Sequence, residues 1–297
     1  MMQNKLFAGF IITFNRPSIL KATIQKVFNQ TFPPEKLWII DNSDGKETEE
    51  MIETLDQYPI VYYYLGYNAG PAYSAKFGLE LAYQEGYEWV FWGDDNDPPL
   101  YGEVFEKLFN LIQIEDNVGA VGAVGQYFEK STGKIKRVPT ELLERKKNID
   151  VDFIAGGYCF IINKSVLEKN IFPNQDLFFG FEELDYCLRI KRGGFRLVVN
   201  PEVFYEYRKR SNRLVVNNID YVKKINLNRE YYSLRNLLMI SDHFGFFKMK
   251  ILLYFKWSIK SVYGFKYGWS YGKKNFKIIW LAFLHFWKGI KGKTIDL

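Results

Sequence analysis

Three carboxylates fall within four residues in the segment Asp94-Asp95-Asn96-Asp97, shortly after the apolar run Trp89–Trp92. Carboxylates this close repel one another unless a cation lies among them. Hard divalent ions such as Mg²⁺ and Mn²⁺ are held by one or two carboxylates together with phosphate oxygens. A solvated acidic turn is the alternative interpretation. The apolar run favours the cation site, because it predicts a buried strand that fixes the acids where the strand ends.

A second acidic cluster, Glu182, Glu183 and Asp185, opens a predicted helix over Glu182–Arg192 and is crowded by aromatic residues. Acids in a first helical turn ordinarily complement the helix dipole, which is the alternative explanation. An apolar surround raises the pKa of a carboxyl group toward values useful for a general base. The segment is therefore a candidate proton acceptor.

Weaker signals follow three other predicted strands. Thr13 and Arg16 lie at the end of the first strand and Asp41 at the end of the second, where together they could hold a base and a ribose. The turn Asn68-Ala69-Gly70 precedes a helix and could place backbone amides near a phosphate. Lys76 lies two turns into that helix, where a lysine is more often a solvated charge than a phosphate ligand.

Short apolar runs alternate with amphipathic stretches over the first 125 residues. The runs predict strands at Leu6–Phe14, Leu37–Ile40, Ile60–Leu65, Trp89–Trp92 and Val118–Val124, and the stretches predict helices from Pro17 to Phe28, at Gly70–Gly86 and at Leu100–Ile114. This alternation indicates an α/β fold with right-handed βαβ units on a mainly parallel sheet flanked by helices. Ligands of such sheets bind beyond the carboxyl ends of the strands, where the polar clusters lie.

The second half is less regular. It predicts strands at Phe153–Asn163, Phe195–Val199 and Val203–Tyr207, and helices at Glu182–Arg192 and Asn217–Ser241. Residues 243–295 follow as a basic aromatic tail, with eleven Lys, sixteen aromatic residues and no Asp or Glu. A mildly acidic body with a strongly basic tail predicts that the tail meets an anionic surface.

We expect this surface to be a membrane, because long Lys stems can snorkel while aromatic rings settle at the headgroup level. The alternatives are packing of the tail helices on the body or on a second subunit, which leaves an oligomer open, and nucleic-acid binding by stacking and phosphate contact. Nucleic acid is disfavoured, because it leaves the acidic clusters unexplained. We expect a cytoplasmic protein that is peripheral to the membrane. The chain has only two cysteines and no signal-peptide pattern, and its apolar runs are shorter than the roughly 20 residues that a transmembrane helix needs.

The order of motifs resembles the family 2 glycosyltransferases, which have the GT-A (Rossmann-like) fold. The subgroup that it resembles most contains bacterial galactofuranosyl- and rhamnosyltransferases. The resemblance covers about residues 6–240 and rests on TFNRP (13–17), NQTFPP (29–34), IIDNSD (39–44), GYNAGPA (66–72), WVFWGDDNDPP (89–99), FFGFEELDYCLRIKRGGF (178–195) and REYYSLRN (229–236).

The resemblance implies a GT-A catalytic domain over residues 1–216, and the basic aromatic composition of the tail indicates a helical, membrane-associating region over 217–297. The resemblance also implies Mn²⁺ or Mg²⁺ on the donor diphosphate, held by the acidic triplet. The family's triplet maps onto Asp94, Asp95 and Asn96, or, shifted by one residue, onto Asp95, Asn96 and Asp97. Asp95 is the favoured ligand in both, and we take Asp95, Asn96 and Asp97 as the metal set, with Asp94 toward the nucleotide sugar. The family often supplies a late histidine ligand, which this chain lacks near its final predicted strand, so Glu206 is the expected substitute.

The donor is then a UDP- or dTDP-linked sugar, galactofuranose or rhamnose, contacted by Thr13, Arg16, Asp41, Asn68, Gly70 and Lys76. The resemblance makes Glu183 the catalytic base of an inverting transfer to a lipid-linked or growing cell-surface glycan. Glu182 and Asp185 are expected to face that acceptor. A non-catalytic sugar-nucleotide binder is the alternative, suggested by Asn96 and the missing histidine.

Overall fold

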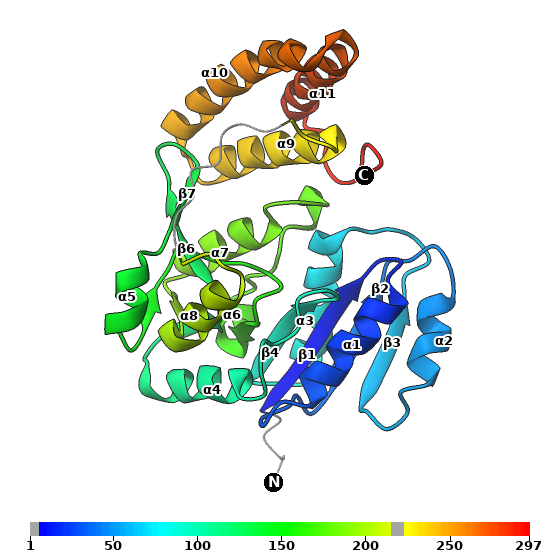
Figure 1. Cartoon of the computed structure of the whole chain (residues 1–297), viewed down its shortest axis with the longest axis vertical. Coiled ribbons are helices and arrows are strands. Elements are labelled where there is room, and N and C mark those ends of the chain that lie inside the picture. The colour runs from blue at the N-terminus through cyan, green and yellow to red at the C-terminus, as the bar shows by residue number, and fades with distance from the viewer. Residues whose placement is uncertain (1–5, 215–222) are drawn as a thin grey trace.

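The computed structural model describes residues 6–214 and 223–297, and an eight-stranded mixed sheet forms its centre (Figure 1). The strand order is β3-β2-β1-β4-β10-β5-β11-β8, and β7-β6-β9 form a second, antiparallel sheet. The strands are β1 (Phe7–Thr13), β2 (Leu37–Asp41), β3 (Ile60–Tyr64), β4 (Trp89–Asp94), β5 (Val118–Gly122), β6 (Gly125–Glu129), β7 (Lys134–Arg137), β8 (Ile149–Asp150), β9 (Phe153–Ile154), β10 (Phe160–Asn163) and β11 (Arg196–Val199).

Strands β1 to β4 are mutually parallel, as are β5 and β11, while β10 runs antiparallel between β4 and β5 and β8 runs antiparallel to β11. The prediction of a mainly parallel sheet flanked by helices is confirmed. The helices are α1 (Pro17–Phe28), α2 (Glu47–Glu53), α3 (Pro71–Gln84), α4 (Val104–Ile114), α5 (Thr140–Arg145), α6 (Lys164–Glu168), η1 (Gln175–Leu177), α7 (Glu182–Arg192), α8 (Pro201–Arg210), α9 (Leu227–His243), α10 (Phe247–Tyr263), η2 (Gly264–Tyr267) and α11 (Trp269–Trp287).

The large sheet is buried on both faces, which explains why its strands are nearly continuous apolar runs. Successive side chains of a strand point to opposite faces, so Phe10 enters one core and Ile11 the other. The first core includes residues of α3, α7 and α9, and the second includes residues of α1 and α4. Layers on both faces hold the carboxyl ends of β1, β2 and β4 at one edge.

Two predicted strands of the second half are wrong. Residues 203–207 lie in α8, because the Asn200 side chain accepts a hydrogen bond from the Val203 amide and Pro201 occupies the first helical position. The single strand predicted over 153–163 is divided into β9 and β10 by residues 155–159, where Cys159 has a φ of 54°. The helix predicted from Asn217 begins at Leu227, where the Asn226 side chain caps it, and residues 217–222 lie outside the described part of the chain.

Helices α10 and α11 pack against α9 and form a layer at one end of the molecule (Figure 1). The layer meets the body where the Phe246 ring lies 6.1 Å from that of Phe128 and where Met249 lies against Gly133 in the β6–β7 turn. Within residues 6–214 and 223–297, no helix has the combined length and apolarity that crossing a bilayer requires.

Candidate active site

The ends of β1, β2 and β4 bring together most residues of the predicted donor site. In the sheet register Thr13 pairs with Asp41, and Ile12 pairs with Asp94. The Asp95 side chain, immediately beyond β4, accepts hydrogen bonds from Thr13 Oγ1 and Arg16 Nη1, each at 3.0 Å. Arg16 therefore faces the acidic segment, where it offsets part of the carboxylate charge.

Asp41 is fully buried and anchors the second strand end. One carboxylate oxygen accepts from the Ser43 amide at 2.8 Å and the other from the Tyr62 hydroxyl at 2.7 Å, and burial together with Asp41 raises the pKa of Tyr62. Asn42, which the sequence analysis missed, lies beside it. Its side chain donates to Ser74 Oγ at 2.9 Å and accepts from the Ala69 amide at 3.0 Å. It therefore fixes the turn before α3 against the end of β2.

The turn itself is closed by Asn68, whose side-chain oxygen accepts from the Gly70 amide at 3.0 Å. Gly70 has a φ of 80°, and a Cβ there would overlap the Phe178 ring and carbonyl. Both the left-handed backbone and the close approach require glycine at this position. Through Phe178 the turn contacts the loop that leads to α7.

Carboxylates of the acidic segment lie in a strongly negative environment. Burial, followed by the charges of Glu183, Asp95 and Asp97, raises the pKa of Asp94 to about 7, and Arg16 partly opposes this. Burial and the charge of Asp95 also raise the pKa of Asp97, whereas the Asn96 side chain between them is exposed. Asp95 and Asp97 thus repel each other, and Asp94 faces Glu183.

Two adjacent glutamates open α7, and their surroundings differ. Burial raises the pKa of Glu183, while hydrogen bonds from its own amide and that of Gly156 lower it. Glu182 is 6% exposed, and its Oε2 atom has no hydrogen-bond partner in the described structure. Burial and the charge of Glu183 raise its pKa well above the usual range, although its own amide and that of Gly180 oppose this. Glu183 is therefore the carboxyl group that ionises more readily.

The loop before α7 is strained and held from α9. Phe178, Gly180 and Phe181 all have positive φ, a conformation that aromatic residues adopt only when their surroundings impose it. The fully buried Asn236 side chain donates to the carbonyls of Leu177, Phe179 and Gly180 at 2.8 to 3.0 Å.

Arg235, also fully buried, donates to the Leu177 carbonyl at 3.2 Å and to the Gly292 carbonyl at 2.9 Å. The 229–236 motif had been recognised only through the family resemblance. Its contacts with the loop show that Arg235 and Asn236 position the start of α7.

Two glycines that the sequence analysis did not single out line the acidic centre. A Cβ at Gly156 would overlap the Glu183 carboxylate, and one at Gly157 would overlap that of Asp97. The loop between β9 and β10 therefore passes directly beside the catalytic candidate and the acidic segment. The two consecutive glycines were the sequence feature that could have indicated this close approach of the backbone.

Three predicted site residues lie elsewhere. Lys76 contacts Gln175 at 3.4 Å and Glu80 at 3.6 Å, on the face of α3 that meets η1. Glu206 is on α8, which follows β11, and its charge contributes to raising the pKa of Tyr101. It is not among the charges that shift the pKa values of Asp94, Asp95 and Asp97.

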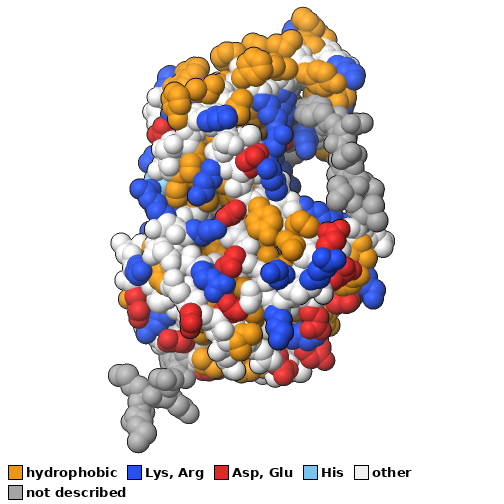
Figure 2. Space-filling model, turned by 90° about the vertical axis from the view of Figure 1, so that its left-hand side faces the viewer, with side chains coloured by type: hydrophobic (Ala, Val, Ile, Leu, Met, Phe, Trp, Pro, Cys, Tyr) orange, Lys and Arg blue, Asp and Glu red, His pale blue; other side chains and the backbone are white. Residues whose placement is uncertain are grey.

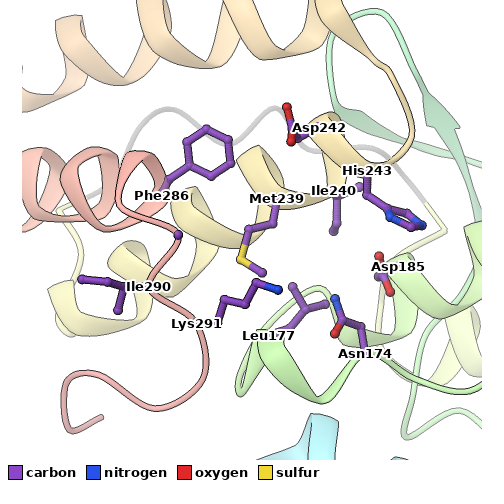
Figure 3. Close-up of a pocket in the computed structure, with 11 residues that line it drawn as sticks. Asn174, Leu177, Asp185, Met239, Ile240, Asp242, His243, Phe286, Ile290 and Lys291 are labelled. Carbon is purple, nitrogen blue, oxygen red and sulfur yellow. The ribbon is translucent and has the colours of Figure 1, made fainter.

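Asp185, predicted to face the acceptor, is two residues from Glu183 and on another face of α7. It binds Arg189 at 2.5 Å and lines a separate pocket with His243 and Lys291 (Figure 3). Burial raises its pKa, and Arg189 and His243 lower it. The structure therefore does not bring Asp185 to the acidic centre.

A divalent cation fits the donor set of the acidic centre. The described residues contain no group of three or more His, Cys, Asp or Glu side chains arranged to hold a metal unaided. Mg²⁺ and Mn²⁺ do not require one, since they take one or two carboxylates and complete their coordination with phosphate oxygens and water. Mutual repulsion between Asp95 and Asp97 is what such an ion would relieve.

The curated relative matched by the chain is the GalNAc(5)-diNAcBac-PP-undecaprenol beta-1,3-glucosyltransferase of Campylobacter jejuni. The two sequences are 28% identical over 179 residues, which are 57% of this chain and 55% of the relative. The chain therefore spans about half the length of this relative.

Two solved structures share the fold at 14% identity. The mannosyltransferase PcManGT of Pyrobaculum calidifontis, in complex with GDP-Man and Mn²⁺, has a TM-score of 0.54 over 85% of this chain and 69% of its own. TarS 1–349 of S. aureus, in complex with UDP, has a TM-score of 0.51 over 79% of this chain and 65% of its own. The sequence model described as Glycosyl transferase family 2 matches residues 10–171, more than half of the chain, and the chain therefore belongs to glycosyl transferase family 2.

Proposed function

We propose that the chain transfers a sugar from a nucleotide-diphosphate donor to an acceptor hydroxyl, with inversion at the anomeric carbon. The observation that carries the proposal is the pairing of Glu183, at the start of α7, with Asp94, at the end of β4. Each is half-buried, and the charge of Glu183 raises the pKa of Asp94. The carboxyl ends of the strands thus hold one group suited to accept a proton beside others suited to hold a donor.

The donor lies at the ends of β1, β2 and β4 in this proposal. Thr13, Arg16 and Asp41 contact the nucleotide, the Asn68–Gly70 turn offers backbone amides, and Asp94 faces the sugar. Support comes from the hydrogen bonds that already link these segments. Two structures that share the fold were determined with UDP or with GDP-Man and Mn²⁺, which supports a nucleotide-linked donor.

Asp95 and Asp97 would hold the divalent cation, Mn²⁺ or Mg²⁺, which when bound neutralises charge developing on the departing diphosphate. Asn96 is exposed beside them and completes the proposed set. Asp95 can serve while keeping its hydrogen bonds to Thr13 and Arg16, because each carboxylate oxygen has two lone pairs.

In the transfer step Glu183 accepts the proton of the acceptor hydroxyl, whose oxygen forms the new bond to the anomeric carbon. The bond from that carbon to the diphosphate oxygen breaks, and the nucleoside diphosphate leaves on the opposite face. The two backbone amides that bind Glu183 hold it in place for this role. Glu182, more deeply buried, retains its proton and lies behind it.

We infer that the acceptor is a lipid-linked glycan, since the name of the curated relative specifies an undecaprenol diphosphate acceptor. The sequence resemblance favours galactofuranose or rhamnose as the sugar, and the relative's name adds glucose. The donor sugar is thus a question for a direct comparison of UDP-galactofuranose, dTDP-rhamnose and UDP-glucose.

A peripheral position on the inner face of the membrane fits such an acceptor. The side of α10 away from α9 carries Phe247, Ile251, Phe255, Ile259 and Val262, each at least half exposed. Figure 2 shows hydrophobic side chains gathered with lysines at the end of the molecule formed by these helices. We propose that this face lies on an anionic bilayer without crossing it.

The test is to measure thermal stabilisation of the full chain by the three donors, with and without Mn²⁺, and then nucleotide release with a lipid-diphosphate glycan present. A donor at 100 times its Kd should stabilise the protein by about 2.7 kcal/mol. Metal-dependent stabilisation and release by one donor support the proposal. Stabilisation without release would indicate a non-catalytic binder, and no stabilisation by any donor contradicts the donor site.

A further inference from the structure

A second cavity adjoins the acidic centre, and Asp97 lines it. It has a volume of about 790 Å³ and lies between the 97–100 segment, strands β6 and β7 and the end of α8. This volume is within the range of about 300–1,000 Å³ that small-molecule sites occupy. Its charged lining, which we call the basic cavity, comprises one carboxylate, Asp97, and the cations Lys26, Arg137, Arg208, Arg210 and Arg213.

The arginines of the basic cavity are held by neutral groups. Arg208 donates to the Val138 carbonyl at 2.6 Å and to Thr140 Oγ1 at 3.2 Å, and Arg210 donates to the Leu100 carbonyl at 3.1 Å. Arg137 donates to the carbonyls of Arg213 and Leu214. These bonds fix the guanidinium groups without neutralising them.

No cation of the basic cavity forms an ion pair with a carboxylate in the described part of the chain. Arg208 is only 5% exposed, and burial together with the charge of Arg137 lowers its pKa to about 10. The other four cations are partly or fully exposed. A positive cluster whose members have no ion-paired carboxylate binds an anion favourably, and Arg favours phosphate because its planar fork matches the oxygens.

The basic cavity is joined to the acidic centre by three consecutive residues. Gly156 lies against Glu183, Gly157 lies against Asp97, and Tyr158 lines the cavity. The Tyr158 ring packs edge-on against that of Tyr207, at 5.4 Å between centroids, and both rings belong to the cavity wall. A ligand with an anionic end in the cavity could therefore extend along aromatic rings toward Glu183.

We infer that the basic cavity binds the diphosphate of the lipid-linked acceptor, so that the acceptor's sugar hydroxyl reaches Glu183. The inference rests on the proposed function and names the acceptor's class at the same site. The donor's diphosphate is the competing source. The acceptor is favoured because four of the five cations come from β7 and from residues 208–213, whereas the donor residues lie on β1, β2 and the end of β4.

The test uses inorganic pyrophosphate as the probe, titrated calorimetrically into the metal-free full chain, and UDP with Mn²⁺ as a separate titration. The variant is Arg210→Gln with Arg213→Gln, because both side chains are exposed and their loss should leave the fold intact. The control is Lys209→Gln, an exposed cation of the same helix that does not line the cavity. Unfolding temperatures establish that all proteins are folded.

We expect the double variant to bind pyrophosphate at least about tenfold more weakly, since it loses two guanidinium groups that can donate charged hydrogen bonds to the anion. The control should bind it as the unmodified chain does, and UDP affinity should be unchanged in both. Equal pyrophosphate binding by all three proteins would overturn the inference, and a matching loss of UDP affinity would assign the cavity to the donor. Pyrophosphate binding without any UDP binding would instead contradict the proposed transfer and leave the anion site standing.

Discussion

The adjacent residues Glu182 and Glu183 show how position in a helix divides two identical side chains between roles. Both are near the positive end of α7, and both have raised pKa values because they are buried. Only Glu183 is bound by the Gly156 amide, and only Glu182 has a buried oxygen without a partner. Ionising both neighbouring carboxyl groups is unfavourable, so one of them keeps its proton, and we expect that group to be Glu182.

Glu183→Gln should therefore lower kcat by roughly 10²–10⁴, because the amide preserves the shape of the side chain but cannot accept the proton. Donor affinity should change little, since the donor contacts come from the strand ends. The measurement is kcat and donor KM in the transfer assay. Glu182→Gln is the matched control, and a larger loss in the control than in Glu183→Gln would move the base to Glu182.

The acidic centre also predicts a pH dependence. An acid whose pKa rises from 3.8 to about 7 on folding, as that of Asp94 does, is disfavoured when ionised. Between about pH 4 and about pH 7 the folded chain therefore binds this proton more tightly than the unfolded chain does. The free energy of unfolding of the metal-free chain should fall as the pH rises through this range. Mn²⁺ requires the ionised carboxylates and should therefore raise the unfolding temperature more at about pH 8 than at about pH 5.

The comparison is made by thermal unfolding with and without Mn²⁺ at both pH values. Asp94→Asn removes the titrating group and should reduce the pH dependence of the metal-free unfolding temperature. Asp56→Asn changes an exposed acid beyond α2 and should leave that pH dependence intact. An equal Mn²⁺ effect at both pH values in the unmodified chain would show that these carboxylates do not hold the ion.

Site residues that directly follow strands were predictable, because the ends of parallel strands share one edge whatever the rest of the fold does. Thr13, Arg16 and Asp41 belong to this class. Asn42 was not predictable, since its role depends on Ala69 and Ser74, brought beside it only by tertiary packing. Asp185 was misplaced because helical residues two apart point in very different directions, about 200° apart at 3.6 residues per turn.

At the scale of elements, α9 acts as a brace for the loop that precedes α7. Asn236 supplies three hydrogen bonds to carbonyls of residues 177–180, and Arg235 adds another. Two aromatic residues of this loop have positive φ, so the loop would relax without the brace. The start of α7, and with it Glu183, is thus positioned by a helix about 50 residues later in the chain.

Asn236→Ala should lower stability by about 3 kcal/mol, because it leaves buried carbonyls without donors. It should also lower kcat more than donor KM changes, since the loop carries the base and not the donor contacts. Urea unfolding and steady-state kinetics measure the two effects. Ser233→Ala, which removes only a hydroxyl bonded to the Arg229 carbonyl within α9, is the control. Stability loss with unchanged kcat would restrict Asn236 to a structural role.

Elements with a clear apolar run or amphipathic pattern between turn residues were predicted well, as β1, β4 and α3 show. Elements whose type depends on a helix cap were predicted poorly. Residues 203–207 have the aromatic and β-branched content of a strand, yet the Asn200 cap and Pro201 begin a helix there. The short strand β8 has only two residues and exists because of its neighbour β11 in the sheet, which no local pattern records.

For the whole molecule, the question is what the outer face of the basic aromatic tail meets. The inner side of α10 is satisfied by the body and by α9, with Met249, Leu253 and Trp257 buried. Some of its lysines are also engaged, since Lys260 binds Glu230 and Lys250 binds Asp242. Lys260 is thus engaged within the chain and not available to a membrane. The outer apolar side remains without a covering element in the described structure, which favours a bilayer.

Phe255→Gln combined with Ile259→Gln should reduce recovery of the full chain with anionic vesicles severalfold. Both side chains are more than half exposed, and without them less apolar surface can insert into the bilayer. Neither substitution disturbs a buried contact, so the unfolding temperature should hold. Ile114→Gln, an equally exposed apolar residue at the end of α4, is the matched control and should bind like the unmodified chain. Higher salt should weaken all three through the remaining lysines. Equal vesicle binding by the double variant and the control would show that this face does not insert into the bilayer. Concentration-dependent self-association that is lost only in the double variant would assign this face to contact with a second copy of the chain.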